Sequence, residues 1–366
     1  MPLLQEVPLS DKMLDLLAAL DAAIGVSGDE RLVADVIAAE LDGHHDEHES
    51  DPLGNHYFTR RGSDGGPTVM LCAHMDELGF IVQHVEDEGF VRIVPVGFHD
   101  ARMVVDQDLA IHGKKGAVHG ITGAKPAHVL PPDEAKKAIP IDQLHVDLGT
   151  TSREETEALG VRVGDLATFA RTGLALNGTR VFSGKAVDDR AGCAVMVEVM
   201  RRLGDSPAAT VVGVAAVQEE LGIRGAGPAA TRVKPDVGIA IDVTLCGDTP
   251  GLDYSRLPIS MGKGPAIKYF DWAPEVGYGS AVPRRLTDQF ERAADAAGVA
   301  YQREVLLGGA TDAWGIASAG FLTGCISMPS RYIHSAVGCV HLDDVEGTVQ
   351  LILAFIDDVG KNGVAA

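Results

Sequence analysis

The sequence predicts an α/β protein with a doubly wound, mostly parallel sheet flanked by helices, interrupted by a smaller β-rich insert. Three observations lead to this fold class. Apolar runs typical of buried strands alternate with amphipathic helical stretches near the start of the chain and again after about residue 180. Between these regions, short strand-like runs are separated by Gly-rich turns. The 366 residues also exceed what one hydrophobic core usually supports.

Residues 1–79 are expected to form the first part of the α/β domain. Two stretches with helical spacing, "SDKMLDLLAALDAAIG" and "SGDERLVADVIAAELDG", precede the first strands. Ser27 and Glu30 stand in capping-box register at the start of the second stretch. The run "PTVMLCAH" is typical of a strand buried on both faces, and it ends at His74.

Residues 80–170 are expected to form the insert, and residues 171–366 the rest of the α/β domain. The insert contains the short runs "FIVQHVEDEGFVRIVPV", "LAIHGKKGAVHGITG" and "LATFA", with little helix beyond "SREETEALG". The last part alternates the strands "ATVVGVAAVQ", "DVGIAIDV" and "GCISM" with helical stretches such as "DDRAGCAVMVEVMRRLG" and "RLTDQFERAADAAG". This alternation predicts completion of the doubly wound sheet.

The composition excludes several classes of protein. A formal net charge of −21 argues against nucleic-acid binding, because phosphate contacts require clustered Lys and Arg. Five Cys without CxxC spacing argue against a disulfide framework and favour the reducing cytosol. The sequence contains no apolar run of about 18 residues and no secretory pattern. We therefore expect a cytoplasmic protein with no nucleic-acid or membrane partner.

Ionisable residues gather where the expected strands end or a helix begins: His74, Asp188, Glu219, Glu220, Asp242 and His334. In open α/β sheets, ligand sites form beyond the carboxyl ends of the strands, so we expect these residues to converge. Two His, two Asp and one Glu suit a borderline divalent ion such as Zn, Co or Mn, and the absence of thiolates favours an open, catalytic metal site.

Two pairs in this set suggest a division of roles. Asp76 lies two residues beyond His74, so in an extended strand end it can accept the second ring N–H of the imidazole. Of Glu219 and Glu220, one carboxylate can bind a metal ion while the other accepts a proton from water.

Each signal also has an ordinary structural explanation. A His after a strand is usually a polar loop residue, the pair Asp188 and Asp189 is commonly a helix cap, and adjacent Glu residues such as Glu219 and Glu220 are common on a solvated face. The segment "GHHDEHESD" is expected to be a solvated loop rather than a metal site, although it holds His44, His45 and His48.

Five motifs in order, "AHMDELGF", "GKAVDDRAG", "VQEELGIRGA", "IDVT" and "SRYIHS", resemble the M42 family of metallo-aminopeptidases, which includes glutamyl and tetrahedral aminopeptidases. Further segments in family order, among them "GVSGDE", "DPLGN", "VDLGTTSREE" and "GGATDA", extend the resemblance over nearly the whole chain. The resemblance implies a two-metal peptidase catalytic domain with an inserted, β-barrel-like dimerisation domain.

The resemblance also implies two divalent metal ions per subunit, Zn or Co, with Mn as an alternative. Matched position by position, Asp188 bridges the two ions. His74 and Asp242 complete one metal site, and Glu220 and His334 complete the other.

The implied reaction is removal of N-terminal residues from peptides. Glu219 matches the general base, and a metal-bridging hydroxide attacks the first peptide carbonyl. Asp76 matches the aspartate that supports the metal-binding His, and related enzymes carry a non-proline cis peptide just after it. Thr311 and Asp312 match a segment near the substrate pocket, although a turn that caps a helix is the ordinary alternative.

The family assembles through the insert into dimers and tetrahedral twelve-subunit particles, so the resemblance implies a homo-oligomer that acts on peptides. This chain differs from the common pattern in "VGFHDARMVVDQ", where Phe98 and His99 replace Gly and Trp, and in "KYFDWAPEVGYGSAVPRR". Both segments bear on assembly and substrate access.

Three other functions are weighed. A metal-dependent deacylase of small N-acyl substrates would use the same two-metal chemistry. A glycoside hydrolase would use paired carboxylates, but it leaves His74, Asp242 and His334 unexplained. A non-catalytic scaffold has no need of a general base at Glu219.

Overall fold

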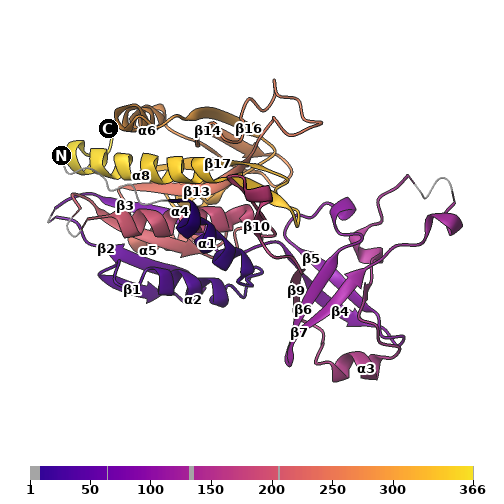
Figure 1. Cartoon of the computed structure of the whole chain (residues 1–366). Helices are drawn as coiled ribbons and strands as arrows, with labels where there is room; N and C mark the ends of the chain where they lie inside the picture. Colours follow the sequence, from indigo (N-terminus) through magenta and orange to yellow (C-terminus); the bar gives the residue numbers. More distant parts are fainter. Residues whose placement is uncertain (1–8, 64, 132–135, 205–206, 366) are drawn as a thin grey trace. The chain divides into compact units, whose positions relative to one another are not determined.

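The computed structural model describes residues 9–63, 65–131, 136–204 and 207–365, which form two compact units (Figure 1). The first unit comprises Met1–Asp76, Gly173–Ile333 and Val337–Ala366. The second comprises Glu77–Thr172 together with His334–Ala336. The chain therefore leaves the first unit after Asp76 and returns to it at Gly173.

The first unit is built on a mixed sheet of 12 strands in the described residues. Its main path runs β1-β2-β12-β3-β13-β17-β18-β11-β10, and β14, β15 and β16 branch from β17. The central strands β12, β3, β13 and β17 are mutually parallel, whereas the flanking strands pair antiparallel. Their bounds are β1 (Glu47–Ser50), β2 (His56–Arg60), β3 (Thr68–His74), β10 (Leu174–Ala175), β11 (Val181–Gly184), β12 (Thr210–Ala216), β13 (Val237–Leu245), β14 (Ala266–Ala273), β15 (Tyr278–Ala281), β16 (Gln302–Leu307), β17 (Thr323–Arg331) and β18 (Gly338–His341).

Helices cover both faces of this sheet. They are α1 (Leu9–Ala22), α2 (Arg31–Glu40), α4 (Val187–Arg202), α5 (Ala226–Val233), α6 (Arg284–Ala297), α7 (Asp312–Ser318) and α8 (Leu342–Asn362), with a short 3-10 turn at Leu176–Gly178. On β3, Leu71 packs into the core formed with α1, α2, α4, α6 and α8, whereas Met70 and Cys72 pack on the opposite face with α5 and α7. Successive residues of a strand point to opposite faces, which explains why the run "TVMLCAH" is apolar throughout.

The second unit is a closed barrel in the order β4-β5-β8-β7-β6-β9. Its elements are β4 (Gly79–Val85), β5 (Val91–Val96), β6 (Asp108–Gly113), β7 (Gly116–Thr122), β8 (Val146–Asp147), β9 (Leu166–Phe169), α3 (Arg153–Ala158) and 3-10 turns at Ala101–Met103, Ala127–Val129 and Ile141–Gln143. A separate apolar core fills it, and the His99 ring stacks on buried Phe80 at 4.4 Å between centroids. Phe98, its neighbour, is 78% exposed.

The expected fold class is confirmed, with parallel strands at the centre of the sheet and a further parallel pair, β14 and β16, in its branch. Two local expectations were wrong. The segment that holds His48 is the edge strand β1 rather than a loop, because it pairs antiparallel with β2. The capping box at Ser27 and Glu30 does not form, since Glu30 occupies the N-cap position of α2 without a side-chain cap.

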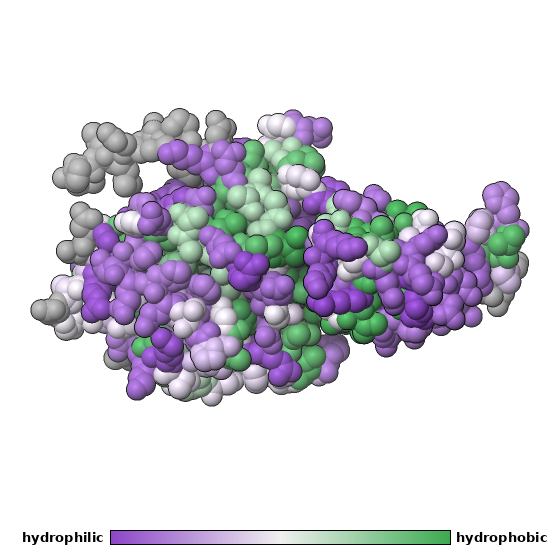
Figure 2. Space-filling model, turned by 90° about the horizontal axis from the view of Figure 1, so that it is seen from below, coloured by the Kyte–Doolittle hydropathy of each residue, from purple (hydrophilic) through white to green (hydrophobic). Residues whose placement is uncertain are grey.

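One face of the molecule is largely hydrophilic with smaller hydrophobic areas (Figure 2), in keeping with the net charge of −21. Among the described residues, no helix is both long enough and apolar enough to cross a membrane.

Truncating Ile239 to Ala should destabilise the first unit by about 2–5 kcal/mol, because Ile239 is completely buried on β13 and its loss leaves a cavity. Urea unfolding, followed by circular dichroism, should show a lower midpoint. Leu307→Ala is the control, since Leu307 is 70% exposed and its truncation should change stability by no more than about 0.5 kcal/mol. Equal midpoints for the two variants would contradict this description of the core.

Candidate active site

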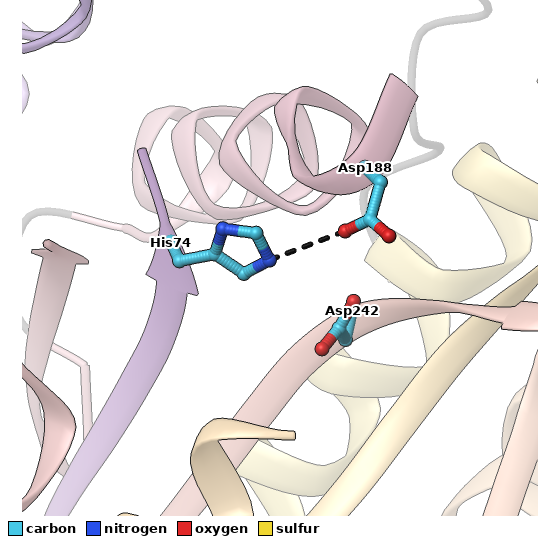
Figure 3. A group of neighbouring side chains, drawn as sticks. All are labelled: His74, Asp188 and Asp242. Carbon is cyan, nitrogen blue, oxygen red and sulfur yellow. Dashed lines mark ion pairs between the residues drawn. The ribbon is translucent and has the colours of Figure 1, made fainter. Parts of the chain in front are cut away.

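The predicted residues lie at the carboxyl edge of the parallel strands. His74 is the last residue of β3 and Asp242 lies on β13, both buried. Asp188 stands in the first turn of α4. Figure 3 shows the three side chains pointing toward a common space. Because β12, β3 and β13 run in the same direction, residues distant in sequence meet at this edge.

His74, Asp188 and Asp242 each offer one ligand atom within 4.8 Å of the others. Nε2 of His74 lies 3.2 Å from Oδ1 of Asp188, the ion pair marked by the dashed line in Figure 3. An imidazole nitrogen and carboxylate oxygens in this spacing form a donor set that suits a borderline divalent ion.

Asp76 orients the His74 ring, as its position two residues along the chain predicts. Nδ1 of His74 lies 3.1 Å from the backbone oxygen of Asp76 and 3.3 Å from its carboxylate Oδ1. Both oxygens accept hydrogen bonds, so they hold a proton on Nδ1 and leave Nε2, the nitrogen that faces Asp188, as the one that could bind a metal ion.

The Asp76 carboxylate also holds the turn that follows β12. It accepts hydrogen bonds from the backbone N–H of Glu219 at 3.0 Å and of Glu220 at 3.1 Å, and from the Ser27 hydroxyl at 2.6 Å. Burial raises the pKa of Asp76, but His74, Ser27 and these donors outweigh it, so the pKa lies below its ordinary value. A single ionised carboxylate thus fixes three segments of chain.

Ser27 and Glu30 support the site, a role that the sequence analysis missed. Oε1 of Glu30 accepts from the backbone N–H of Gln218 at 3.1 Å and of Gly28 at 2.8 Å. Gln218 has φ of +56°, so this contact stabilises an uncommon backbone geometry just before Glu219. The signal in the sequence was the segment "GVSGDE", whose polar residues were interpreted as a helix start.

For Asp189 the sequence offered a helix cap as the ordinary explanation, and its contact with the backbone of Gly192, three residues on, is of that kind. Asp189 is completely buried, its Oδ1 accepts the backbone N–H of Gly192 at 2.9 Å, and a side chain at Gly192 would lie 2.3 Å from its carboxylate. The cis peptide bond lies between Asp188 and Asp189. The expectation of a cis bond just after Asp76 was therefore wrong.

The carboxylates of the site raise one another's pKa. Burial, and then the charge of Asp242, raise the pKa of Asp189 well above its ordinary value. Burial and Asp188 do the same for Asp242, while His74 and the buried Lys268 lower it. So many buried carboxylates are unfavourable without cations, since unpaired charges in a low dielectric are costly. This donor set therefore fits divalent metal.

Glu219 and Glu220 are partly buried and follow β12. Burial raises the pKa of Glu219 well above its ordinary value, and the charges of Glu220 and Asp242 add to this rise while His74 opposes it. A carboxylate with a raised pKa is a better proton acceptor, as general-base catalysis requires.

Thr311 and Asp312 lie at the start of α7. The Thr311 hydroxyl accepts the N–H of Ala313, so the capping interpretation holds for this residue. Asp312 is buried, and its carboxylate accepts a hydrogen bond from the Cys72 thiol at 3.4 Å. Burial raises the pKa of Asp312 to about 6.

His334 packs with the second unit, where its Nδ1 lies 3.0 Å from the backbone oxygen of Phe98. Its backbone φ is +58°. The expected second metal site, formed by Asp188, Glu220 and His334, stays a prediction.

The sequence model of the M42 glutamyl aminopeptidase family matches residues 54–351. The chain belongs to this family. It resembles the lysyl aminopeptidase of Pyrococcus furiosus, with 33% identity, 94% of this chain and 97% of the relative covered. The solved aminopeptidase of the archaeon Desulfurococcus kamchatkensis is 36% identical with a TM-score of 0.90, over 97% of this chain and 98% of that one.

A third relative is the TET1 peptidase of Pyrococcus horikoshii, which can assemble into a tetrahedron or a large octahedral shell. It is 30% identical with a TM-score of 0.84, over 94% of this chain and 98% of that one. The resemblance drawn from the sequence is therefore confirmed. This M42 protein is a metallo-exopeptidase.

Glu30 should make the stability of this M42 protein depend on pH. Burial, opposed by the Gly28 N–H, raises its pKa from 4.5 to about 7. The folded state thus favours the protonated acid, and this contribution is lost as the pH rises from about 4.5 to about 7. Glu30→Gln cannot ionise, so its stability relative to the unsubstituted protein should increase over that window by at most about 3 kcal/mol.

Urea midpoints at pH 5 and pH 8 test this expectation. Glu88→Gln is the control, because Glu88 is exposed. A Glu30→Gln difference that stays constant between the two pH values would disprove the assignment.

Proposed function

We propose that this protein is a two-metal-dependent aminopeptidase that removes N-terminal residues from peptides, with Glu219 as general base. One observation carries the proposal: the ligand atoms of His74, Asp188 and Asp242 gather within 4.8 Å at the carboxyl edge of the sheet. Membership of the M42 family supports it.

Two divalent ions per subunit are proposed, Zn or Co, with Mn as an alternative. His74, Asp188 and Asp242 would hold one ion. Asp188 would also hold the second, together with Glu220 and His334. Nitrogen and oxygen donors without a thiolate support an open, catalytic site rather than a closed structural one. When bound, the ions would polarise the first peptide carbonyl and favour deprotonation of water.

Glu219 is proposed to take the proton from the attacking water and then to deliver it to the departing amine. Its backbone N–H is held by Asp76, so the start of its side chain has a defined place beside the metal ligands. Asp76 is assigned the second role of fixing the His74 tautomer, because Nδ1 faces two oxygens of that residue. Holding the Glu219 backbone and fixing the His74 tautomer both depend on an ionised Asp76 carboxylate, and the lowered pKa of Asp76 favours that form.

The substrate role of Thr311 and Asp312 is a further part of the proposal. Asp312 is buried close enough for its charge to raise the pKa of Glu219. A carboxylate near the metal ligands can attract the free α-amine of a peptide, which would restrict cleavage to the first bond.

The barrel is proposed to mediate dimerisation, and the dimers to assemble into particles of up to twelve subunits with tetrahedral symmetry. The proposed location of the protein is the cytoplasm. The reported assembly of the P. horikoshii TET1 peptidase supports this part of the proposal. Residues 1–79 and 171–366 would form the catalytic domain, and residues 80–170 the dimerisation domain.

Substituting Glu219 by Gln should lower kcat for aminoacyl p-nitroanilides by about 10²–10⁴-fold, since the amide cannot accept the proton of water. Metal-stripped protein would be assayed against a panel of such substrates, before and after addition of Zn²⁺, Co²⁺ or Mn²⁺. Activity should return with metal in the unsubstituted protein and remain low in the variant. Glu154→Gln is the matched control, because Glu154 is exposed on α3.

Elemental analysis of the Glu219→Gln protein should show an unchanged metal content, which separates loss of the base from loss of the ions. Full activity in the variant would rule out Glu219 as the base. Activity that survives thorough metal removal would reject metal dependence.

Acetylating the N-terminus of a peptide substrate should abolish its hydrolysis, because an aminopeptidase requires the free α-amine. The test compares product release from one tripeptide with a free and with an acetylated amine, measured by mass spectrometry. Preferential cleavage of the acetyl group would instead indicate the deacylase.

A further inference from the structure

Three His side chains gather on the β1–β2 hairpin, and the active site described above uses none of them. The hairpin register pairs His48 with Phe58 and Ser50 with His56. Side chains on alternate positions of paired strands share one face, so His48 and His56 are diagonal neighbours on the face that carries Phe58. Nε2 of His48 and Nδ1 of His56 share a hydrogen bond at 2.9 Å, so a metal ion bound by both nitrogens would take the place of the shared proton.

Phe58 fixes the position of these rings. It is completely buried, and the His48 ring stacks on it at 4.3 Å between centroids with an interplanar angle of 18°. The ring centroid of His48 lies 5.2 Å from that of His56 and 5.7 Å from that of His45. Nδ1 of His45 is buried and has no hydrogen-bond partner among the described residues. The pair is thus held on an apolar platform with a third imidazole beside it.

The distance between Nε2 of His48 and Nδ1 of His56 sets the angle that these atoms would subtend at a bound metal ion. With metal–nitrogen bonds of about 2.0–2.1 Å, two ligand nitrogens 2.9 Å apart subtend an angle of about 90° at the metal. That angle belongs to square-planar or octahedral coordination, whereas a tetrahedral ion needs a wider separation of about 3.3 Å. We propose that His48 and His56 form a bis-imidazole site for a divalent transition-metal ion, Cu²⁺ or Ni²⁺ in preference to Zn²⁺, with His45 as the nearest additional ligand.

The surroundings keep the imidazoles in the form that binds metal. Burial lowers the pKa of His48, and the neighbouring His56 and His45 lower it further. Burial also lowers the pKa of His56, against the opposing charges of Asp35 and Asp51. The lowered pKa of each ring favours the neutral form that metal ligation requires, and the two carboxylates favour a cation nearby.

The site is also accessible. All four residues of β1 are exposed, His48 among them, and within the part of the chain that the structure describes β1 is an edge strand paired with β2 alone. An ion can reach His48 and His56 from solvent without rearrangement of the sheet, and its coordination shell can be completed by water.

Equilibrium dialysis against Ni²⁺ at pH 7.5 tests the proposal, using protein already loaded with metal at the active site. Total bound metal, measured by elemental analysis, should be one equivalent higher in the unsubstituted protein than in His48→Gln or His56→Gln. Where residual binding persists in these variants, it should be weaker by at least about tenfold. His84→Gln is the matched control, since His84 is an exposed His on β4 and its loss should leave the extra equivalent in place.

Each variant should keep its aminopeptidase activity and its circular dichroism spectrum, because the hairpin His residues do not belong to the catalytic machinery. With Cu²⁺ as probe, electron paramagnetic resonance should show nitrogen hyperfine splitting that disappears in His48→Gln. Equal Ni²⁺ binding in all four proteins, no extra equivalent in any of them, or binding only at millimolar Ni²⁺ would overturn the proposal.

Discussion

Negative charge collected at one edge of the sheet is the constraint on which the rest of this structure depends. Asp188, Asp189 and Asp242 are brought together there, and the charges of their carboxylate neighbours raise the pKa of Asp189 and of Asp242. Parallel strands create that meeting point, since their carboxyl ends share an edge. Room for Asp189 is provided by Gly192, which has no side chain to displace its carboxylate. The need for cations at this edge therefore follows from how the chain folds, apart from what the reaction requires.

Asp76 differs from these carboxylates, because it is buried and yet its pKa lies below the ordinary value. Its hydrogen bonds come from the end of β3, from the loop before α2 and from the turn after β12, so its ionised form stabilises all three. Arg190 on α4 is a buried positive charge with a similar role. Its guanidinium donates hydrogen bonds to the backbone oxygens of Met75 and Ala23. These two buried charges fix the backbone around His74.

The sequence was sufficient for features that depend on local pattern. The continuous apolar run before His74 indicated a doubly covered strand, and residues at strand ends indicated which edge carries chemistry. The role of Ser27 was hidden because the sequence alone does not show whether a hydroxyl four residues before a helix caps that helix or donates to Asp76, which lies 49 residues away in the chain. The contact between the His48 and His56 rings could not be predicted from the sequence either, because it depends on the register in which β1 pairs with β2.

The interruption of the first unit after Asp76 has a consequence for how the chain reaches its native state. β3 finds its partners β12 and β13 only after the whole barrel segment has been synthesised, because residues 77–172 separate them. Closing so long a loop costs entropy, and topologies dominated by distant strand pairs fold slowly. The barrel has its own apolar core and its strands pair among themselves, so it can form first and bring the two ends of that loop together. Because β4 and β9 pair near the two ends of the insert, a folded barrel shortens the effective loop between β3 and β12.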